Sequence, residues 1–277
     1  MLYTMSEILK DAQEKKYGVG YFNGVNTEMI RAYIRAAEDN NSPIIIGTGE
    51  GLLRYSSFDW IAPLLLDAAR KARVPVAVHL DHTYKFDLIM QALRAGFGSV
   101  MFDGSQLSYE ENVAGSCKIA EIAHPMGVGV ECELGFVGGF EGKDGNIADN
   151  VYTDPDFAVD FVEKTQVDFL AVSIGTVHGK YATTPKLDLE RLAEIRGKVE
   201  IPLVLHGGSG LSDTDFSNCI AGGISKVNIY TDIITAGAKA IDEATGLKYT
   251  DQQQAAEQAM YEAAANKLRI FDSINRY

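Results

Sequence analysis

Short apolar runs recur along the whole chain, and amphipathic stretches long enough for helices separate them. Runs rich in β-branched residues are typical of buried strands, and their alternation with helical stretches predicts βα units around a parallel sheet. Helical stretches include residues 27–40, 86–96, 157–166 and 187–198, and several of them end on Gly, Asn or Lys, as helices often do. We expect eight strands, at residues 18–23, 42–49, 74–82, 99–105, 127–135, 167–176, 201–209 and 224–232.

The number and spacing of these runs favour a closed (β/α)8 TIM barrel over an open doubly wound sheet. Both architectures bury strands on two faces, which explains the near-continuous apolarity of the runs. We expect a single domain over residues 1–277, because a barrel of this kind commonly takes about 250 residues. The helical composition after Gly237 predicts a C-terminal helical extension that caps the barrel or packs on a partner.

Polar residues end nearly every apolar run at its C-terminal side. In a barrel these ends share one face, and that face carries the active site in enzymes of this fold. After the fifth run, residues 138–155 are rich in Gly, Asp and Asn and show no helical period. Such a segment is either a mobile active-site lid or a disordered insert, and its place on the catalytic face favours the lid.

Composition and charge exclude several classes of function. Hydrophobic residues at 46% and charged residues at 23% are typical of a globular protein with a sizeable core. The net charge of -13 argues against nucleic acid and anionic membranes as partners, because both bind basic surfaces. There is no signal-peptide pattern and no apolar run of the roughly 20 residues that span a bilayer. The three scattered cysteines lack a CxxC spacing and predict neither disulfides nor a thiolate zinc site, so we expect a reducing cytoplasm.

Three of the five histidines follow different predicted strands: His82 the third, His178 the sixth and His206 the seventh. A single histidine at a strand end more often only satisfies local hydrogen bonds. A barrel would bring these three together, however, and three neutral imidazoles with one open position form a Lewis-acid zinc site. His79, within the third strand, is expected to support this site or to belong to the core, and His124 to be structural.

Carboxylates and a glycine-rich turn gather on the same predicted face. Acids at strand ends are costly to bury unless they bind a metal or transfer protons. The HGGSG sequence at 206–210 places backbone amides after the seventh strand, where barrels commonly bind phosphate, and Asn228 and Thr231 complete that site. The acids of this face are Asp81, Asp103, Glu131, Glu133 and Glu141.

Together these motifs resemble the class II fructose-bisphosphate and tagatose-bisphosphate aldolase family over essentially the whole chain. The stretches that carry the likeness, in the family's order, are HLDH (79–82), SVMFDGS (99–105), VECELGFVGG (130–139), AVSIGTVHGKY (171–181), PLVLHGGSG (202–210) and KVNIYTD (226–232). The resemblance implies a metal-dependent lyase that reversibly cleaves a ketose 1-phosphate or ketose 1,6-bisphosphate. The products would be dihydroxyacetone phosphate and an aldehyde, formed through a zinc-stabilised enediolate. It also implies a homodimer or homotetramer.

The resemblance assigns chemical roles to residues of this chain. Asp81 would exchange the proton of the C4 oxygen, and Glu141, in the lid, would carry the proton at the carbon of dihydroxyacetone phosphate. Asp103 and Glu133 match a second metal position. No Schiff-base lysine is required, and we interpret Lys226, like Lys180, as a surface or phosphate-proximal charge. The catalytic Zn2+ would be held by His82, His178 and His206.

Substrate and cation contacts are implied by the same resemblance. A monovalent cation, Na+ or K+, would bind the carbonyls of Val177, Gly179 and Gly207 together with Ser209. The expected substrate-binding residues are Asn23, Thr48, Gly179, Gly207, Gly208, Ser209, Asn228, Tyr230 and Thr231.

Two positions depart from the family pattern. Tyr230 stands where fructose-bisphosphate enzymes commonly carry an Asp, and Gln253, within residues 248–254, stands where the family usually has an Arg for the distal phosphate. Glutamine cannot supply a bidentate cation. An alternative substrate is therefore a ketose 1-phosphate with a sulfonate, carboxylate or uncharged distal end. Further alternatives are a zinc hydrolase on the same barrel and a non-catalytic binding subunit, which would be marked by loss of a zinc ligand or of Asp81.

Overall fold

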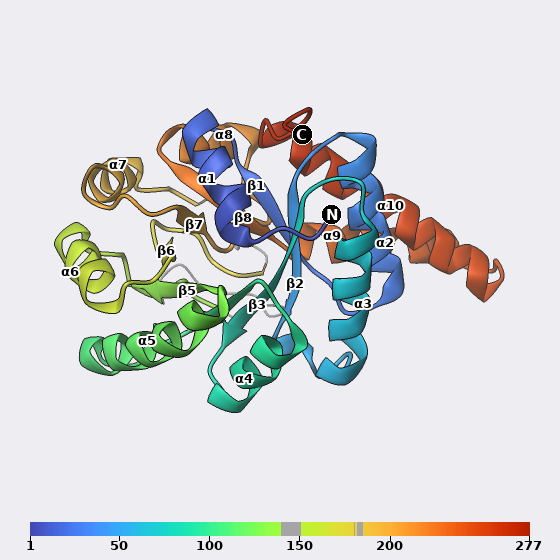
Figure 1. Ribbon diagram of the computed structural model, residues 1–277. Coiled ribbons are helices and arrows are strands. Elements are labelled where there is room, and N and C mark those ends of the chain that lie inside the picture. Colours follow the sequence, from blue (N-terminus) through green and yellow to red (C-terminus); the bar gives the residue numbers. More distant parts are fainter. Residues whose placement is uncertain (140–150, 180, 182–184) are drawn as a thin grey trace.

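The structure is a computed structural model that describes residues 1–139, 151–179, 181 and 185–277. Eight parallel strands close into a barrel in sequence order, and β8 pairs back onto β1. The predicted TIM barrel is confirmed (Figure 1). The strands are β1 (Val19–Asn23), β2 (Ile44–Gly49), β3 (Val76–Thr83), β4 (Ser99–Phe102), β5 (Gly129–Leu134), β6 (Phe169–Val172), β7 (Leu203–Leu205) and β8 (Ile224–Ile229).

An α-helix follows each strand, and further helices stand at both ends of the chain. The four helices expected over 27–40, 86–96, 157–166 and 187–198 are present. The α-helices are α1 (Met5–Lys15), α2 (Thr27–Asp39), α3 (Phe58–Lys71), α4 (Phe86–Ala95), α5 (Tyr109–Ala123), α6 (Pro155–Thr165), α7 (Leu189–Lys198), α8 (Asp213–Ala221), α9 (Thr231–Glu243) and α10 (Tyr249–Ile270). Two 3-10 turns complete the described elements, η1 (Glu50–Leu52) and η2 (His124–Met126).

Local sequence signals fix where several helices begin. At the start of α1, the side chain of Thr4 accepts a hydrogen bond from the backbone of Glu7, whose carboxylate accepts one from the backbone of Thr4. This capping box satisfies two otherwise unpaired amides and recurs at α5 and α8. Asp154 caps α6 directly before Pro155, so the segment after β5 ends at a defined helix start.

Helix α1 closes the N-terminal end of the barrel. Its buried residues Met5, Ile8 and Leu9 pack with inward-facing residues of several strands, such as Tyr21 and Val204. A larger apolar core lies between the outer faces of the strands and the surrounding helices. Apolar side chains fill the N-terminal end of the interior, and buried polar side chains such as Asp81 and His206 lie at or near the carboxyl ends of the strands.

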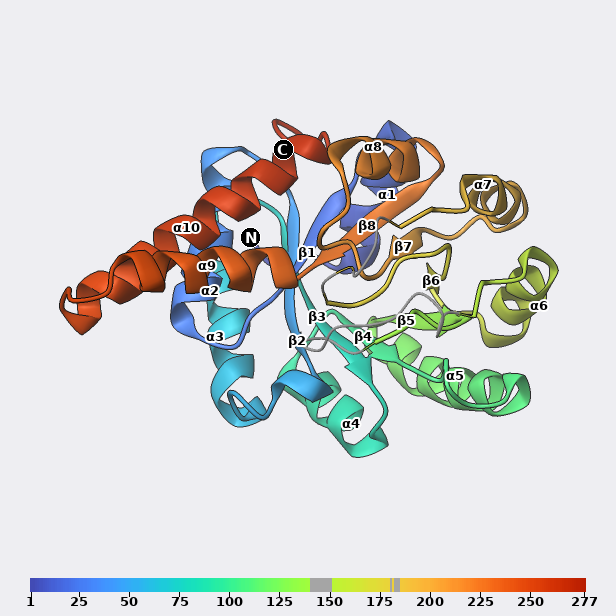
Figure 2. The same cartoon turned by 180° about the vertical axis from the view of Figure 1, so that it is seen from behind.

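The predicted C-terminal helical extension is present as α9 and α10. Helix α10 packs along α2 and α9 and projects beyond the barrel (Figures 1 and 2). Large apolar side chains near its start are solvent-exposed, with Leu247 at 57% and Tyr249 at 72% of full exposure. None of the described helices is long and apolar enough to cross a membrane.

Candidate active site

A bulge in β3 turns two neighbouring side chains, Asp81 and His82, toward the interior of the barrel. Leu80 pairs with Val100 and Thr83 with Phe102, so β3 has one residue more than β4 between these pairs. His82 lies in this bulge and has a positive φ of 32°, which is uncommon for a residue other than glycine. Adjacent strand residues normally face opposite sides, and a bulge changes that alternation. The bulge therefore supplies both a candidate ligand and a candidate acid.

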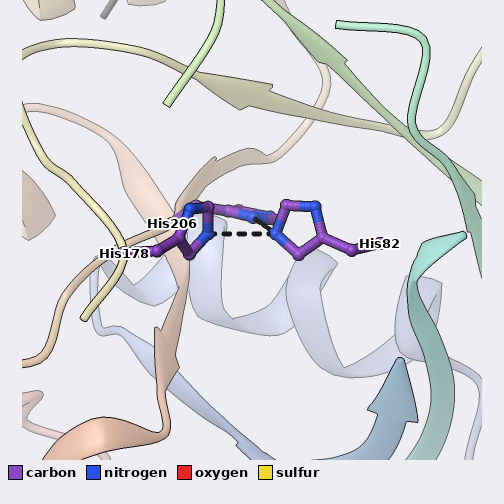
Figure 3. Close-up of side chains that lie close together, drawn as sticks. All are labelled: His82, His178 and His206. Atoms are coloured by element: carbon purple, nitrogen blue, oxygen red, sulfur yellow. Dashed lines mark hydrogen bonds between the residues drawn. The ribbon is translucent and has the colours of Figure 1, made fainter. Parts of the chain in front are cut away.

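The three predicted zinc ligands meet at one point (Figure 3). His82 Nε2 lies 3.1 Å from His178 Nε2 and 2.6 Å from His206 Nδ1. Neutral imidazole nitrogens this close repel one another unless a proton or a cation lies between them. A tetrahedral zinc ion with Zn–N bonds of about 2.0–2.1 Å keeps its nitrogens about 3.3 Å apart. The donor set and its spacing therefore fit a zinc ion.

In two of these rings, the outer nitrogen, which points away from the other histidines, contacts a carboxylate. The inner nitrogen of each ring is the one at the meeting point. His82 Nδ1 lies 2.8 Å from Asp103 Oδ2, and His206 Nε2 lies 2.9 Å from Glu131 Oε1. A carboxylate on the outer nitrogen fixes the tautomer and leaves the inner nitrogen free to bind a metal. His178 comes from the loop after β6, where its backbone amide donates to the carbonyl of Gly138. Burial, together with the neighbouring His82, lowers the pKa of His178, which favours the neutral ligand form.

Asp103 and Glu133, the predicted second metal position, both lie beside His82. Glu133 Oε1 accepts a hydrogen bond from the backbone amide of Val137, and its Oε2 has no hydrogen-bond partner among the described residues. Burial and the nearby Asp103 carboxylate raise the pKa of Glu133 to about 8. These three side chains could hold an ion, but Asp103 here accepts the ring proton of His82, so the second position stays a prediction.

Asp81 is fully buried beside the three histidines. The side-chain amides of Asn23 and Asn228 donate to its two oxygens, each at 3.2 Å. Burial alone would raise the pKa of Asp81, but the facing His82 holds it well below its usual range. An ionised carboxylate, fixed by two amides and placed next to the candidate metal site, can accept or return a proton. The predicted substrate contact Asn23 therefore acts here as a support for Asp81.

Beside His178 lies a small hollow at the N-terminus of α9. This helix begins at Thr231, and its N-cap Tyr230 makes no capping hydrogen bond through its side chain. Ser209 Oγ lies 3.2 Å from the backbone nitrogens of Tyr230 and Asp232. A helix N-terminus with backbone amides around it attracts anions. The hollow is lined by His178, Gly179, Gly207, Gly208, Ser209, Asn228, Tyr230 and Thr231, which brings together seven of the nine predicted substrate-binding residues.

Gly207 needs to be glycine where the loop after β7 meets the loop after β6. Its φ is 65°, and a Cβ atom there would lie 2.4 Å from the carbonyl oxygen of Val177. The hydroxyl of Tyr181 joins the same two loops, donating to the carbonyl of Gly207 at 2.8 Å and accepting from the amide of Val177. The proposed monovalent cation site would use these carbonyls. Sequence reasoning did not single out Tyr181, although it lies within one of the family motifs.

Some predictions fall elsewhere in the structure. Thr48 is buried in β2 in register with Leu80, and it is not among the described residues that line the hollow at α9 or the one over His82. Glu141 and Lys180, with most of the predicted lid, lie outside the described residues. His79 is buried, and its Nδ1 is hydrogen-bonded to the hydroxyl of Ser99, as expected for a supporting or core residue. A second hollow, over His82, is lined in part by side chains that sequence reasoning missed, Tyr84, Phe136 and Val137.

The prediction for Lys226 is wrong. Its side chain is fully buried inside the barrel, where its ammonium group lies 2.8 Å and 3.0 Å from the two oxygens of Glu131. It also lies 4.6 Å from the centre of the Tyr21 ring. Lys226 is the third residue of β8, inside the strand rather than at its end, and its side chain turns into the barrel interior.

The sequence matches the family described as class-II fructose-bisphosphate aldolase over residues 3–276. The chain belongs to this family. It is 41% identical, over 99% of both chains, to a probable fructose-bisphosphate aldolase of Bacillus subtilis. It is 39% identical, over 95% of both, to the uncharacterized protein YdjI of Escherichia coli.

Solved structures agree with the sequence comparison. The crystal structure of the YdjI aldolase from Escherichia coli K12 superposes with a TM-score of 0.89 at 36% identity, over 99% of both chains. A putative fructose-1,6-biphosphate aldolase from Coccidioides immitis gives a TM-score of 0.91 at 30% identity, over 98% of this chain and 96% of that one. Membership of this aldolase family makes the protein an enzyme of the lyase class.

Proposed function

We propose that the protein is a zinc-dependent aldolase that reversibly cleaves a ketose 1-phosphate to dihydroxyacetone phosphate and an aldehyde. One observation carries the proposal: the inner nitrogens of His82, His178 and His206 converge beside the buried carboxylate of Asp81 and next to the hollow at α9. When bound, the zinc ion supplies Lewis-acid stabilisation of the negative charge that develops on the ketose oxygens.

The residues around this centre are proposed to bind the phosphate and to transfer the two protons of the reaction. The positive end of the α9 helix dipole and the Gly207 to Ser209 turn bind the 1-phosphate, because both line the hollow and a helix N-terminus attracts anions. Asp81 takes the proton of the C4 hydroxyl in cleavage and returns it in condensation, in the orientation that Asn23 and Asn228 impose. Glu141 is proposed to carry the proton at the hydroxyl-bearing carbon of dihydroxyacetone phosphate, on the side of the carbonyl away from the phosphate.

The distal end of the substrate is proposed to carry something other than phosphate. Tyr230 and Gln253 both line a groove between α2, α9 and α10, and among its described lining residues the one charged side chain is the acidic Glu28. Gln253 donates to the hydroxyl of Tyr249 rather than offering a cation. This setting disfavours a dianionic second phosphate, and we propose a sulfonate, a carboxylate or an uncharged group in its place. By family likeness we also propose a homodimer or homotetramer, which sedimentation would test.

A panel of ketose phosphates tests the proposal. Zinc-loaded protein is incubated with ketose 1-phosphates and 1,6-bisphosphates, and dihydroxyacetone phosphate is measured before and after chelation. Formation of this product that is lost on chelation and restored by zinc is expected. Release of inorganic phosphate without dihydroxyacetone phosphate would instead support the zinc hydrolase. Cleavage of fructose or tagatose 1,6-bisphosphate with kcat/KM of about 10^4 to 10^8 per molar per second would refute the distal-end proposal alone.

A further inference from the structure

A buried charge pair lies beneath the candidate metal site. Lys226 and Glu131 are both fully buried, and the lysine ammonium contacts both oxygens of the glutamate, at 2.8 Å and 3.0 Å. Glu131 Oε1 is shared, because His206 Nε2 lies 2.9 Å from the same oxygen. A continuous chain of contacts thus runs from Lys226 through Glu131 to one of the three histidines.

Neither stability nor the proposed reaction accounts for this pair. Removing two charges from water is costly, and well-packed apolar residues in place of a buried ion pair are often neutral or stabilising. The apolar layer directly below, which includes Tyr21 and Phe169, shows that the barrel interior can be filled without charges. The proposed cleavage also needs no amine nucleophile. The contact to His206 is therefore the feature of the pair that relates to function.

We propose that Glu131, held in place by Lys226, is a positioning residue that orients His206 for metal binding; this rests on the proposed metal site. As the acceptor for the Nε2 proton, the carboxylate fixes the tautomer in which Nδ1 carries the lone pair. Nδ1 is the nitrogen that faces His82 Nε2, at 2.6 Å. Lys226 binds both oxygens of the carboxylate, so the acceptor cannot rotate away from the ring.

The outer nitrogens of the other two histidines have different surroundings. Asp103 holds the outer nitrogen of His82 from the loop after β4, near the mouth of the barrel. The outer nitrogen of His178, Nδ1, has no hydrogen-bond partner among the described residues. His206 is therefore the ring that is supported from the closed interior, where water does not compete for the acceptor. Loss of such a supporting partner typically lowers metal affinity about 10- to 100-fold.

Two matched double variants test the proposal: Glu131→Gln/Lys226→Met and Glu131→Met/Lys226→Met. Both remove the two charges together, and they differ in whether position 131 keeps an oxygen that can accept from His206. Zinc affinity is measured by competition with a chromophoric chelator, and stability of the metal-free forms by urea unfolding. We expect similar stability for the two, and zinc affinity about 10- to 100-fold lower for the Glu131→Met/Lys226→Met variant. Equal zinc affinity in the two variants overturns the proposal.

Further variants keep the test decisive. If the Glu131→Met/Lys226→Met variant does not fold, Lys226→Met alone is measured: weaker zinc binding supports the anchoring of Glu131, and unchanged binding overturns it. Wild type and His178→Ala are titrated in parallel. Equal zinc binding by these two refutes the metal site itself, whereas tight binding that depends on His178, with no difference between the double variants, refutes only the positioning role.

Discussion

Replacing Asp81 with asparagine should separate the two proton transfers of the proposed reaction. Asparagine has the same shape, but it can no longer accept a proton, and its NH2 group must face the amide donor of Asn23 or of Asn228. General acid–base catalysis contributes about 10^2- to 10^4-fold, so cleavage should slow by that factor, equivalent to about 2.7–5.4 kcal/mol. One lost buried hydrogen bond should cost at most about 1–3 kcal/mol of folding stability.

The assay uses a reaction in which Asp81 has no proposed part. In D2O, the enzyme should exchange a carbon-bound hydrogen of dihydroxyacetone phosphate, which NMR follows without knowledge of the aldehyde. We expect Asp81→Asn to keep this exchange close to the wild-type rate while cleavage of the best ketose phosphate falls by about 10^2 or more. Bound zinc, measured separately, should stay at the wild-type level. Equal losses of exchange and cleavage would refute the assignment of Asp81 to the C4 oxygen.

Three further predictions concern the metal, a turn and a carboxylate. His178→Ala removes one converging nitrogen, so zinc affinity should fall by more than the 10- to 100-fold typical of a lost supporting contact, as chelator competition would show. Gly207→Ala should lower the free energy of unfolding by about 2 kcal/mol or more, because of its φ of 65° and the clash with Val177, whereas Gly197→Ala in α7 should be neutral or stabilising. In metal-free protein, the pKa of Glu133 is raised from 4.5 to about 8. Between these two pH values the folded protein keeps a proton on this carboxyl group that the unfolded chain loses. This contribution to stability is present below pH 4.5 and is lost as pH rises to about 8, so Glu133→Gln should show a smaller decline over this range in urea unfolding; equal slopes would contradict it.

The sequence alone located the strands, because parallel strands covered on both faces leave near-continuous β-branched runs that local inspection can find. It also assigned candidate ligands and phosphate-binding residues to one face, since residues that end parallel strands must meet at the same end of a barrel. His82, His206 and the turn from Gly207 to Ser209 followed from that rule. Glu141 and the rest of the expected lid lie outside the described residues, so their prediction stays open.

Only the tertiary structure decided which way individual side chains face. The bulge that turns both Asp81 and His82 inward depends on a register shift against β4, which strand periodicity alone does not show. The burial of Lys226 depends on closure of the barrel, because an inward position is surrounded by the other strands only once β8 pairs with β1. Its partner Glu131 lies far away in the sequence, on β5. Sequence periodicity therefore identified the candidate side chains, whereas the closed sheet determined which of them touch and which nitrogen of each histidine faces the candidate metal site.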